Sequence, residues 1–102
     1  MTYYFKHIDT YTYFAAHRGS VLEVRNYELQ KSIALVKDWN YSADYQQFHM
    51  EVTEDMPDDK RDFEPISETE FIRNYNDVEM ALTGYKNENQ SIFTIIEKHK
   101  TA

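Results

Sequence analysis

The chain has 102 residues, no cysteine, two glycines and a formal net charge of -7. Hydrophobic residues make up 41% of it, a share that is typical of a single folded domain of this length and not of a disordered chain. The missing cysteines exclude thiol catalysis, disulfides, iron–sulfur clusters and thiolate zinc sites.

The first predicted elements are strands joined by turns. In residues 3–8, Tyr3, Phe5 and His7 alternate with Tyr4, Lys6 and Ile8. Residues 10–14 are rich in β-branched and aromatic side chains, which fit a pleated surface. Gly19 predicts a tight hairpin turn, with this glycine in the first central position of a type II′ turn. Leu22 and Val24 then alternate with charged neighbours, as in a strand with one buried face.

Residues 20–38 fit two structures. Ser20 and Glu23 have the spacing of a capping box, which indicates a helix start. A helix would, however, place Arg25, Glu28 and Ser32 inside its apolar arc. We therefore favour a strand, a turn and a second strand, in which residues 32–37 are largely buried, and keep the helix as the alternative.

A further strand is predicted just before the acidic part of the chain. Phe48, Met50 and Val52 alternate with polar residues over 47–53, which is the period of a half-buried strand.

Residues 68–83 have the clearest helical pattern. Ser67 and Glu70 form a capping box at the start, and Gly84 follows the end, where a helix favours a left-handed residue. One apolar stripe runs along the predicted helix. It consists of Phe71, Tyr75, Val78 and Leu82.

The sequence predicts a polar loop at 87–89 and a last strand at 91–96, which is rich in β-branched residues. The predicted fold is α+β, an antiparallel β-meander of five to six strands with one amphipathic helix (68–83) packed on one face. We expect a single domain over residues 1–102, with a strand-rich part (1–53), an acidic loop (54–66) and a helix plus final strand (67–102).

The net charge is confined to one part of the chain. Residues 1–50 and 71–102 each sum to zero, whereas residues 51–70 hold nine acids against Lys60 and Arg61 and carry the whole charge of -7. This segment is either a solvated loop or a surface for a basic partner, because concentrated like charge speeds association with an opposite charge. The predicted contact residues are Glu54, Asp55, Asp58, Asp59, Asp62 and Glu64.

Tyrosine is the other abundant side chain, with nine copies. Tyr11 and Tyr13 would share one face of a strand, where they form either a contact surface or cross-strand pairs that only stabilise the sheet.

No pattern indicates catalysis or a cofactor. Two glycines 65 positions apart cannot build a phosphate-binding glycine loop. The histidines His7, His17 and His49, with Glu51, could converge from strands on a zinc ion, but their spacing matches no metal motif. Residues 55–62 lack the pattern of a calcium loop, and His17 and Ser20 show no triad arrangement. We therefore predict no enzyme activity, no cofactor and no metal.

The longest wholly apolar run, residues 33–36, is far shorter than the roughly 20 residues of a membrane helix. The first residues do not have the pattern of a signal peptide, so we expect a cytoplasmic protein that does not bind membranes. The negative charge argues against direct nucleic-acid binding, which relies on clustered Lys and Arg.

These observations predict a small acidic, non-enzymatic protein-binding or regulatory module, comparable to an inhibitor, an immunity protein or a phage or bacterial regulator. It would bind a basic protein surface through the acidic loop and a tyrosine-rich face. One alternative is a structural or assembly module that forms homodimers through strand edges or the tyrosine face. Another is a small-ligand binder or enzyme with a pocket lined by tyrosine and histidine.

Overall fold

The computed structural model describes residues 1–87 and 89–101; the loop predicted at 87–89 thus includes one position outside the described residues. Five antiparallel strands form one sheet in the order β4-β3-β2-β1-β5. The strands are β1 (Thr2–His7), β2 (Thr12–His17), β3 (Ser20–Asn26), β4 (Lys31–Val36) and β5 (Phe63–Pro65). The helices are α1 (Ala43–Thr53), α2 (Glu68–Thr83) and α3 (Ile92–Lys100), with 3-10 turns at Trp39–Tyr41 and Asp58–Lys60. The predicted α+β fold with an antiparallel meander is confirmed.

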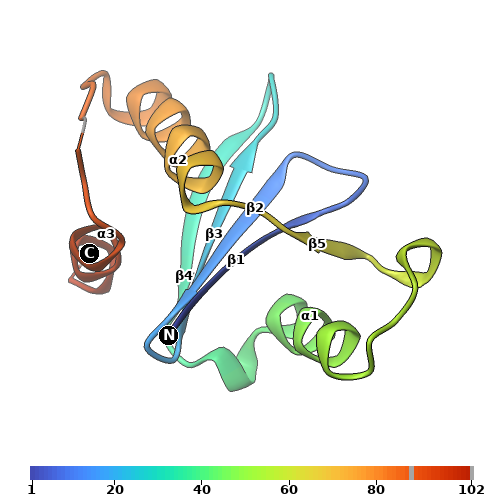
Figure 1. Cartoon of the computed structure of the whole chain (residues 1–102). Coiled ribbons are helices and arrows are strands. Elements are labelled where there is room, and N and C mark those ends of the chain that lie inside the picture. The colour runs from blue at the N-terminus through green and yellow to red at the C-terminus, as the bar shows by residue number, and fades with distance from the viewer. Residues whose placement is uncertain (88, 102) are drawn as a thin grey trace.

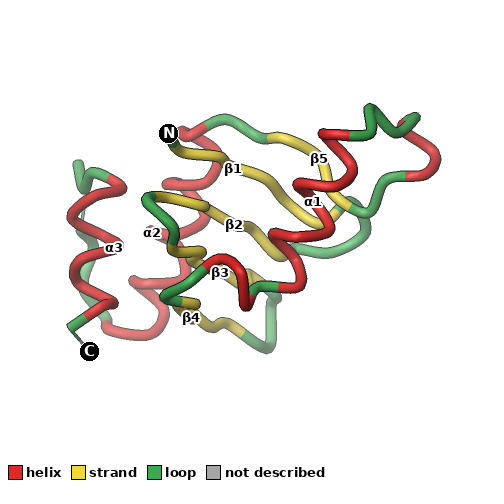
Figure 2. Tube along the Cα trace, turned by 90° about the horizontal axis from the view of Figure 1, so that it is seen from below, coloured by secondary structure: helices red, strands yellow, loops and turns green. Residues whose placement is uncertain are grey.

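The helices cover both faces of the sheet. α2 and α3 lie on one face and α1 lies on the other (Figure 1, Figure 2). Two apolar cores result. One includes Leu22, Phe71 and Ile95, beneath α2 and α3, and the other includes Phe5 and Phe48, beneath α1.

The alternatives for residues 20–38 are resolved as strand, turn and strand, because β3 and β4 pair over their whole length. The preceding turn differs from the prediction. Arg18 (φ 49°) and Gly19 (φ 81°) are its two central residues, between the paired residues His17 and Ser20. Because both have positive φ, the turn has the character of type I′, with the glycine second rather than first. The strand at 32–37 was predicted to be largely buried, yet β4 is an edge strand whose side chains are mostly half-buried.

The strand predicted at 47–53 is wrong, because these residues belong to α1. The Ser42 hydroxyl accepts a hydrogen bond from the Tyr45 amide (3.1 Å) and caps the helix. The buried residues of α1 are Tyr45, Phe48 and Glu51, which follow at intervals of three. Met50 and Val52, which suggested a strand by alternation, are exposed.

The strand predicted at 91–96 is also wrong, because it is α3. The Ser91 hydroxyl accepts from the Thr94 amide (3.1 Å), and Ile92, Ile95 and Ile96 are buried at the i, i+3 and i+4 spacing of a helix. The abundance of β-branched residues was a weaker signal than this spacing, because packing against the sheet overrides propensity.

The helix at 68–83 is confirmed with its predicted bounds. The Ser67 hydroxyl accepts from the Glu70 amide (3.0 Å), and Gly84 (φ 79°) ends the helix by donating to the Met80 carbonyl. Of the predicted stripe, the first three members are buried, but Leu82 in the last turn is 55% exposed.

Candidate functional site: the acidic segment beside β5

The acidic segment, residues 54–66, is a folded part of the molecule rather than one long loop. Asp58–Lys60 forms a 3-10 turn, and β5 pairs with β1. The Ile8 amide donates to the Asp62 carbonyl and the Ile66 amide to the Tyr4 carbonyl, so that the pairing extends beyond both ends of β5. The expectation of a loop throughout 54–66 is therefore corrected, since the segment contains a strand of the sheet.

A buried carboxylate holds this segment against α1. Glu51 is only 1% exposed, and its two oxygens accept from the backbone amides of Asp62 (3.0 Å) and Phe63 (3.1 Å) and from the Gln47 side chain (2.8 Å). Charge-assisted bonds of this kind offset the cost of burying the carboxylate. The sequence suggested Glu51 only as a member of a possible metal set. Glu51 lies three residues after Phe48 on the buried face of α1, a position that the strand prediction for 47–53 did not provide.

Arg61 ties together the turn inside the acidic segment. Its guanidinium Nε donates to the Met56 carbonyl (2.6 Å), and its terminal nitrogens lie 3.7 Å from the Asp55 carboxylate and 3.9 Å from that of Asp58. The arginine is half-buried, whereas both carboxylates are fully exposed. Exposed ion pairs of this kind contribute little stability, so the carboxylates remain available to a partner.

The structure exposes every carboxylate of the predicted contact set. We call these six residues the acidic surface: Glu54, Asp55, Asp58, Asp59, Asp62 and Glu64. A groove of about 420 Å³ lies alongside, and its lining adds Ile8, Phe63 and Pro65 to members of the acidic surface and Arg61. The site therefore combines negative charge with an apolar strip.

The two predicted tyrosines do not form one contact face. Tyr13 is 7% exposed and belongs to the core beneath α2, whereas Tyr11 is 62% exposed with its ring edge against Tyr27. Burial raises the pKa of Tyr13, with a further contribution from Glu70. Of these two tyrosines, only Tyr11 has a side chain that a partner can reach.

The histidines lie apart. His7 contacts the ring of Phe63 at the β5 edge, His17 lies at the far end of β2, where its Nδ1 is 2.7 Å from the Thr2 hydroxyl, and His49 lies on α1. Among residues 1–87 and 89–101, no group of three or more His, Asp or Glu side chains could hold a metal ion.

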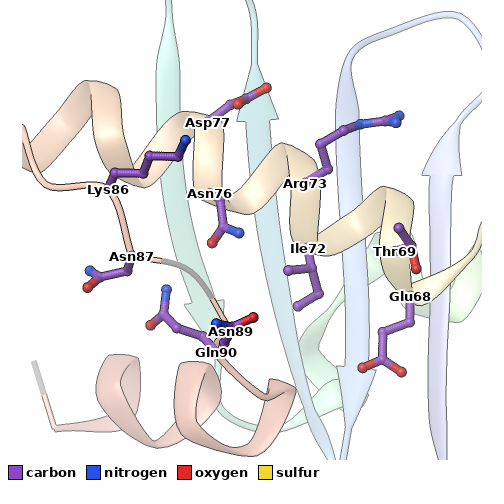
Figure 3. Close-up of a pocket in the computed structure, with 10 residues that line it drawn as sticks. All are labelled: Glu68, Thr69, Ile72, Arg73, Asn76, Asp77, Lys86, Asn87, Asn89 and Gln90. Carbon is purple, nitrogen blue, oxygen red and sulfur yellow. The ribbon is translucent and has the colours of Figure 1, made fainter.

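A larger hollow of about 660 Å³ separates α2 from the segment that leads to α3 (Figure 3). Asn76 and Ile72 point toward it, whereas Arg73 and Asp77 point away. The side-chain oxygen of Asn76 is buried without a hydrogen-bond partner among the residues described. The side-chain amides of Asn87 and Gln90, which also line the hollow, donate to Glu79 (both 3.0 Å) and thus already have a structural use.

The Glu79 carboxylate is the centre of a polar network between α2 and α3. Glu79 also accepts from the Tyr75 hydroxyl (2.6 Å) and from Lys98 Nζ (2.7 Å). Burial alone would raise the pKa of Glu79, but its hydrogen bonds, first those from Lys98 and Tyr75, lower it to about 2. His99 Nε2 lies 2.9 Å from the same hydroxyl. The network fastens α3 to α2, with Tyr75 fully buried and Lys98 at its exposed margin.

Comparisons of this chain with known protein families, with curated proteins and with solved structures find no match. Within the described residues, the structure contains no helix that is long and apolar enough to cross a membrane.

Proposed function

We propose that this chain is a small non-enzymatic protein-binding module, and that its acidic surface binds a positively charged protein. The observation that carries the proposal is the fixed geometry of the acidic segment. The Glu51 carboxylate accepts a hydrogen bond from the backbone of the segment, and Arg61 donates one to the Met56 carbonyl within the segment. The strand β5 joins the segment to the sheet. These contacts hold the backbone that carries the exposed carboxylates in one arrangement, as a binding surface requires.

The electrostatics support the same proposal. The six carboxylates are exposed and lie within eleven consecutive positions, while the remainder of the chain outside 51–70 sums to zero charge. Such an asymmetric distribution orients an approaching cationic partner and raises the association rate, most strongly at low ionic strength. The adjacent groove, with the exposed side chains of Ile8 and Pro65, provides apolar contacts that are not weakened when salt screens the charges.

The partner is defined by this chemistry as a protein surface with clustered Lys and Arg around an apolar side chain. The same acidity does not favour direct binding of nucleic acid. A cytoplasmic location, the setting expected from the sequence, stays a prediction.

The test is capture of partners from lysate at low and high salt. The test variant combines Asp58→Lys, Asp59→Lys and Asp62→Lys. A matched control combines Glu28→Lys, Asp77→Lys and Glu97→Lys, which are also exposed but lie outside the segment. Both variants raise the net charge of -7 by six units, so they differ only in where the charge is changed.

We expect the wild type and the control to retain the same partner at low salt, and the test variant to lose it. Purified partner should then bind at least tenfold more weakly to the test variant, through a slower association rate. Equal loss of binding in both variants would show that the effect depends on the net charge and not on the acidic surface. Retention by all three proteins at all salt concentrations would refute the acidic surface as the binding site.

A further inference from the structure

The two edges of the sheet differ in how they are protected. β5 has three residues and contains Glu64 and Pro65, and a short strand, a charge and a proline all discourage pairing with another chain. β4 has six residues, and its stretch from Ser32 to Val36 contains no charge, proline or glycine. Figure 2 shows β4 on the outer side of the sheet, with the helices over the two faces rather than beyond this edge.

The hydrogen-bonding direction of each β4 residue follows from the hairpin. The Tyr27 amide donates to the Gln30 carbonyl (3.2 Å), and hydrogen-bonded pairs alternate along antiparallel strands. Residues 32, 34 and 36 therefore bond to β3. Lys31, Ile33 and Leu35 direct their amides and carbonyls outward, and in the described part of the chain these groups have no backbone partner.

We propose that β4 pairs in antiparallel fashion with β4 of a second copy of this chain, giving a two-fold symmetric dimer with one continuous sheet. Directly opposed residues of antiparallel strands share a sheet face. A two-fold axis normal to the sheet must therefore pass midway between one residue and the same residue of the second copy. With the axis at Ile33, this residue lies opposite its copy and Lys31 lies opposite Leu35. The outward amides and carbonyls would then form about six hydrogen bonds.

The register centred on Ile33 is favoured over the adjacent one. An axis at Ala34 would place Lys31 opposite Lys37 of the second copy, and directly opposed like charges are destabilising. It would also require the Lys37 carbonyl, which already accepts from the Ser20 hydroxyl (3.1 Å). With the axis at Ile33, the half-buried Ile33 and Leu35 extend the core beneath α2 and α3 across the dimer.

The charge distribution allows a second copy to approach this edge without strong repulsion. The acidic surface lies at the β5 edge, on the far side of the sheet from β4. Joining two copies through β4 places their acidic surfaces on the order of 40 Å apart, from the strand spacing of about 4.8 Å. That distance is several times the screening length of roughly 8 Å at physiological salt, so repulsion between the copies is small. The acidic surface also stays open in the dimer.

The first test measures mass against concentration by light scattering, for the wild type and for Ile33→Pro with Ile33→Val as the matched control. Proline removes the outward amide at the axis, where the fold itself does not use it, whereas valine keeps it. We expect the wild type to shift from 12.3 kDa toward twice that mass as concentration rises. Ile33→Pro should weaken association by about 10- to 100-fold, as expected for the loss of two hydrogen bonds, and the control by much less.

A second variant covers the case in which proline unfolds the chain, which circular dichroism of the dilute protein would reveal. Ala34→Lys replaces an exposed side chain and lies opposite Glu23 within the monomer, so the fold should be kept. In the dimer it brings two lysines close together across the axis, and we expect it to weaken association by about tenfold.

The third measurement locates the interface. Because the chain has no cysteine, a spin label can be placed through a single Ala34→Cys or Asp59→Cys change. Labels at 34 should lie close together in the dimer, and labels at 59 should lie far apart. A strict monomer at every concentration would overturn the proposal, and so would a dimer with close labels at 59 or one that neither edge variant weakens. Binding of an unrelated extended peptide to monomeric β4 would also overturn it, since the occupant would then be another chain.

Discussion

At the scale of single residues, Glu51 links the fold to the candidate site. Its buried carboxylate accepts hydrogen bonds from the backbone amides of Asp62 and Phe63. We expect Glu51→Ala to lower the free energy of unfolding by about 2–4 kcal/mol, because those amides lose their partner. The measurement is denaturant unfolding, combined with amide hydrogen exchange at Asp62 and Phe63, which should become faster.

The neighbouring Glu54→Ala is the control for this change, because Glu54 is exposed and no hydrogen bond to its side chain is present among the residues described. It should change the free energy of unfolding by less than about 0.5 kcal/mol. Equal effects of the two substitutions, or unchanged exchange at Asp62 and Phe63 in Glu51→Ala, would show that Glu51 does not hold the acidic segment.

Glu79 gives a prediction on pH dependence. Its pKa is lowered to about 2 in the folded chain, from an ordinary value of 4.5. A carboxylate with a lowered pKa stabilises the fold above its unfolded value, and this stabilisation is lost as the pH falls from about 4.5 toward 2. It amounts to about 3 kcal/mol at neutral pH. We expect Glu79→Gln to be less stable at pH 7 but to approach the wild type at pH 2.

The measurement for Glu79 is the difference in unfolding free energy between wild type and Glu79→Gln across this range. The histidines begin to act at higher pH. Burial lowers the pKa of both His17 and His99, so their protonation destabilises the fold as the pH falls below about 6.5. A difference that stays constant from pH 7 to 2 would mean that Glu79 is not held as a carboxylate by Lys98 and Tyr75.

At the scale of elements, α3 can be tested by two neighbouring apolar residues. In a strand, Phe93 and Ile95 would share a face, whereas in α3 the isoleucine is fully buried and the phenylalanine is 47% exposed. We expect Ile95→Ala to cost about 2–5 kcal/mol of unfolding free energy. Phe93→Ala should cost about 1 kcal/mol or less, because it loses mainly its contact with the Arg18 guanidinium (5.1 Å). Similar losses for both would contradict the helix.

The pattern of α2 was unopposed, and in β3 the strand pattern was favoured because the competing helix would have placed charged residues in its apolar arc. Leu22 and Val24 alternate with charged residues in β3, and Ser67 and Gly84 bracket α2 with both of its caps. Residues 47–53 have two periods at once, and the contact of Phe48 with the ring of Phe5 in the sheet (4.1 Å) favours the helical one. That contact joins distant parts of the chain, so a local pattern does not reveal it.

The acidic residues of the candidate site were predictable from the sequence, but the buried contacts that hold them in place were not. The acidic residues at 54–64 were identified because the local net charge can be counted directly from the sequence. The contribution of Glu51 was hidden, since a buried acid and an exposed acid are identical in sequence. Tyr13 shows the opposite error, because a tyrosine expected at a contact surface lies in the core.

At the scale of the whole molecule, the confined charge predicts how stability responds to salt. The acidic surface repels itself over short distances, and the screening length shortens from about 30 Å at 0.01 M salt to about 3 Å at 1 M. We expect the free energy of unfolding of the wild type to rise by about 1 kcal/mol between low and high sodium chloride. The variant with Asp58→Lys, Asp59→Lys and Asp62→Lys should lose most of this rise, because the net charge of residues 51–70 then changes from -7 to -1. The control variant, changed at Glu28, Asp77 and Glu97, has the same net charge but keeps the acidic surface, so it should retain the rise. If both variants lose it equally, total charge rather than its confinement governs the stability, and the self-repulsion assigned to this surface is absent.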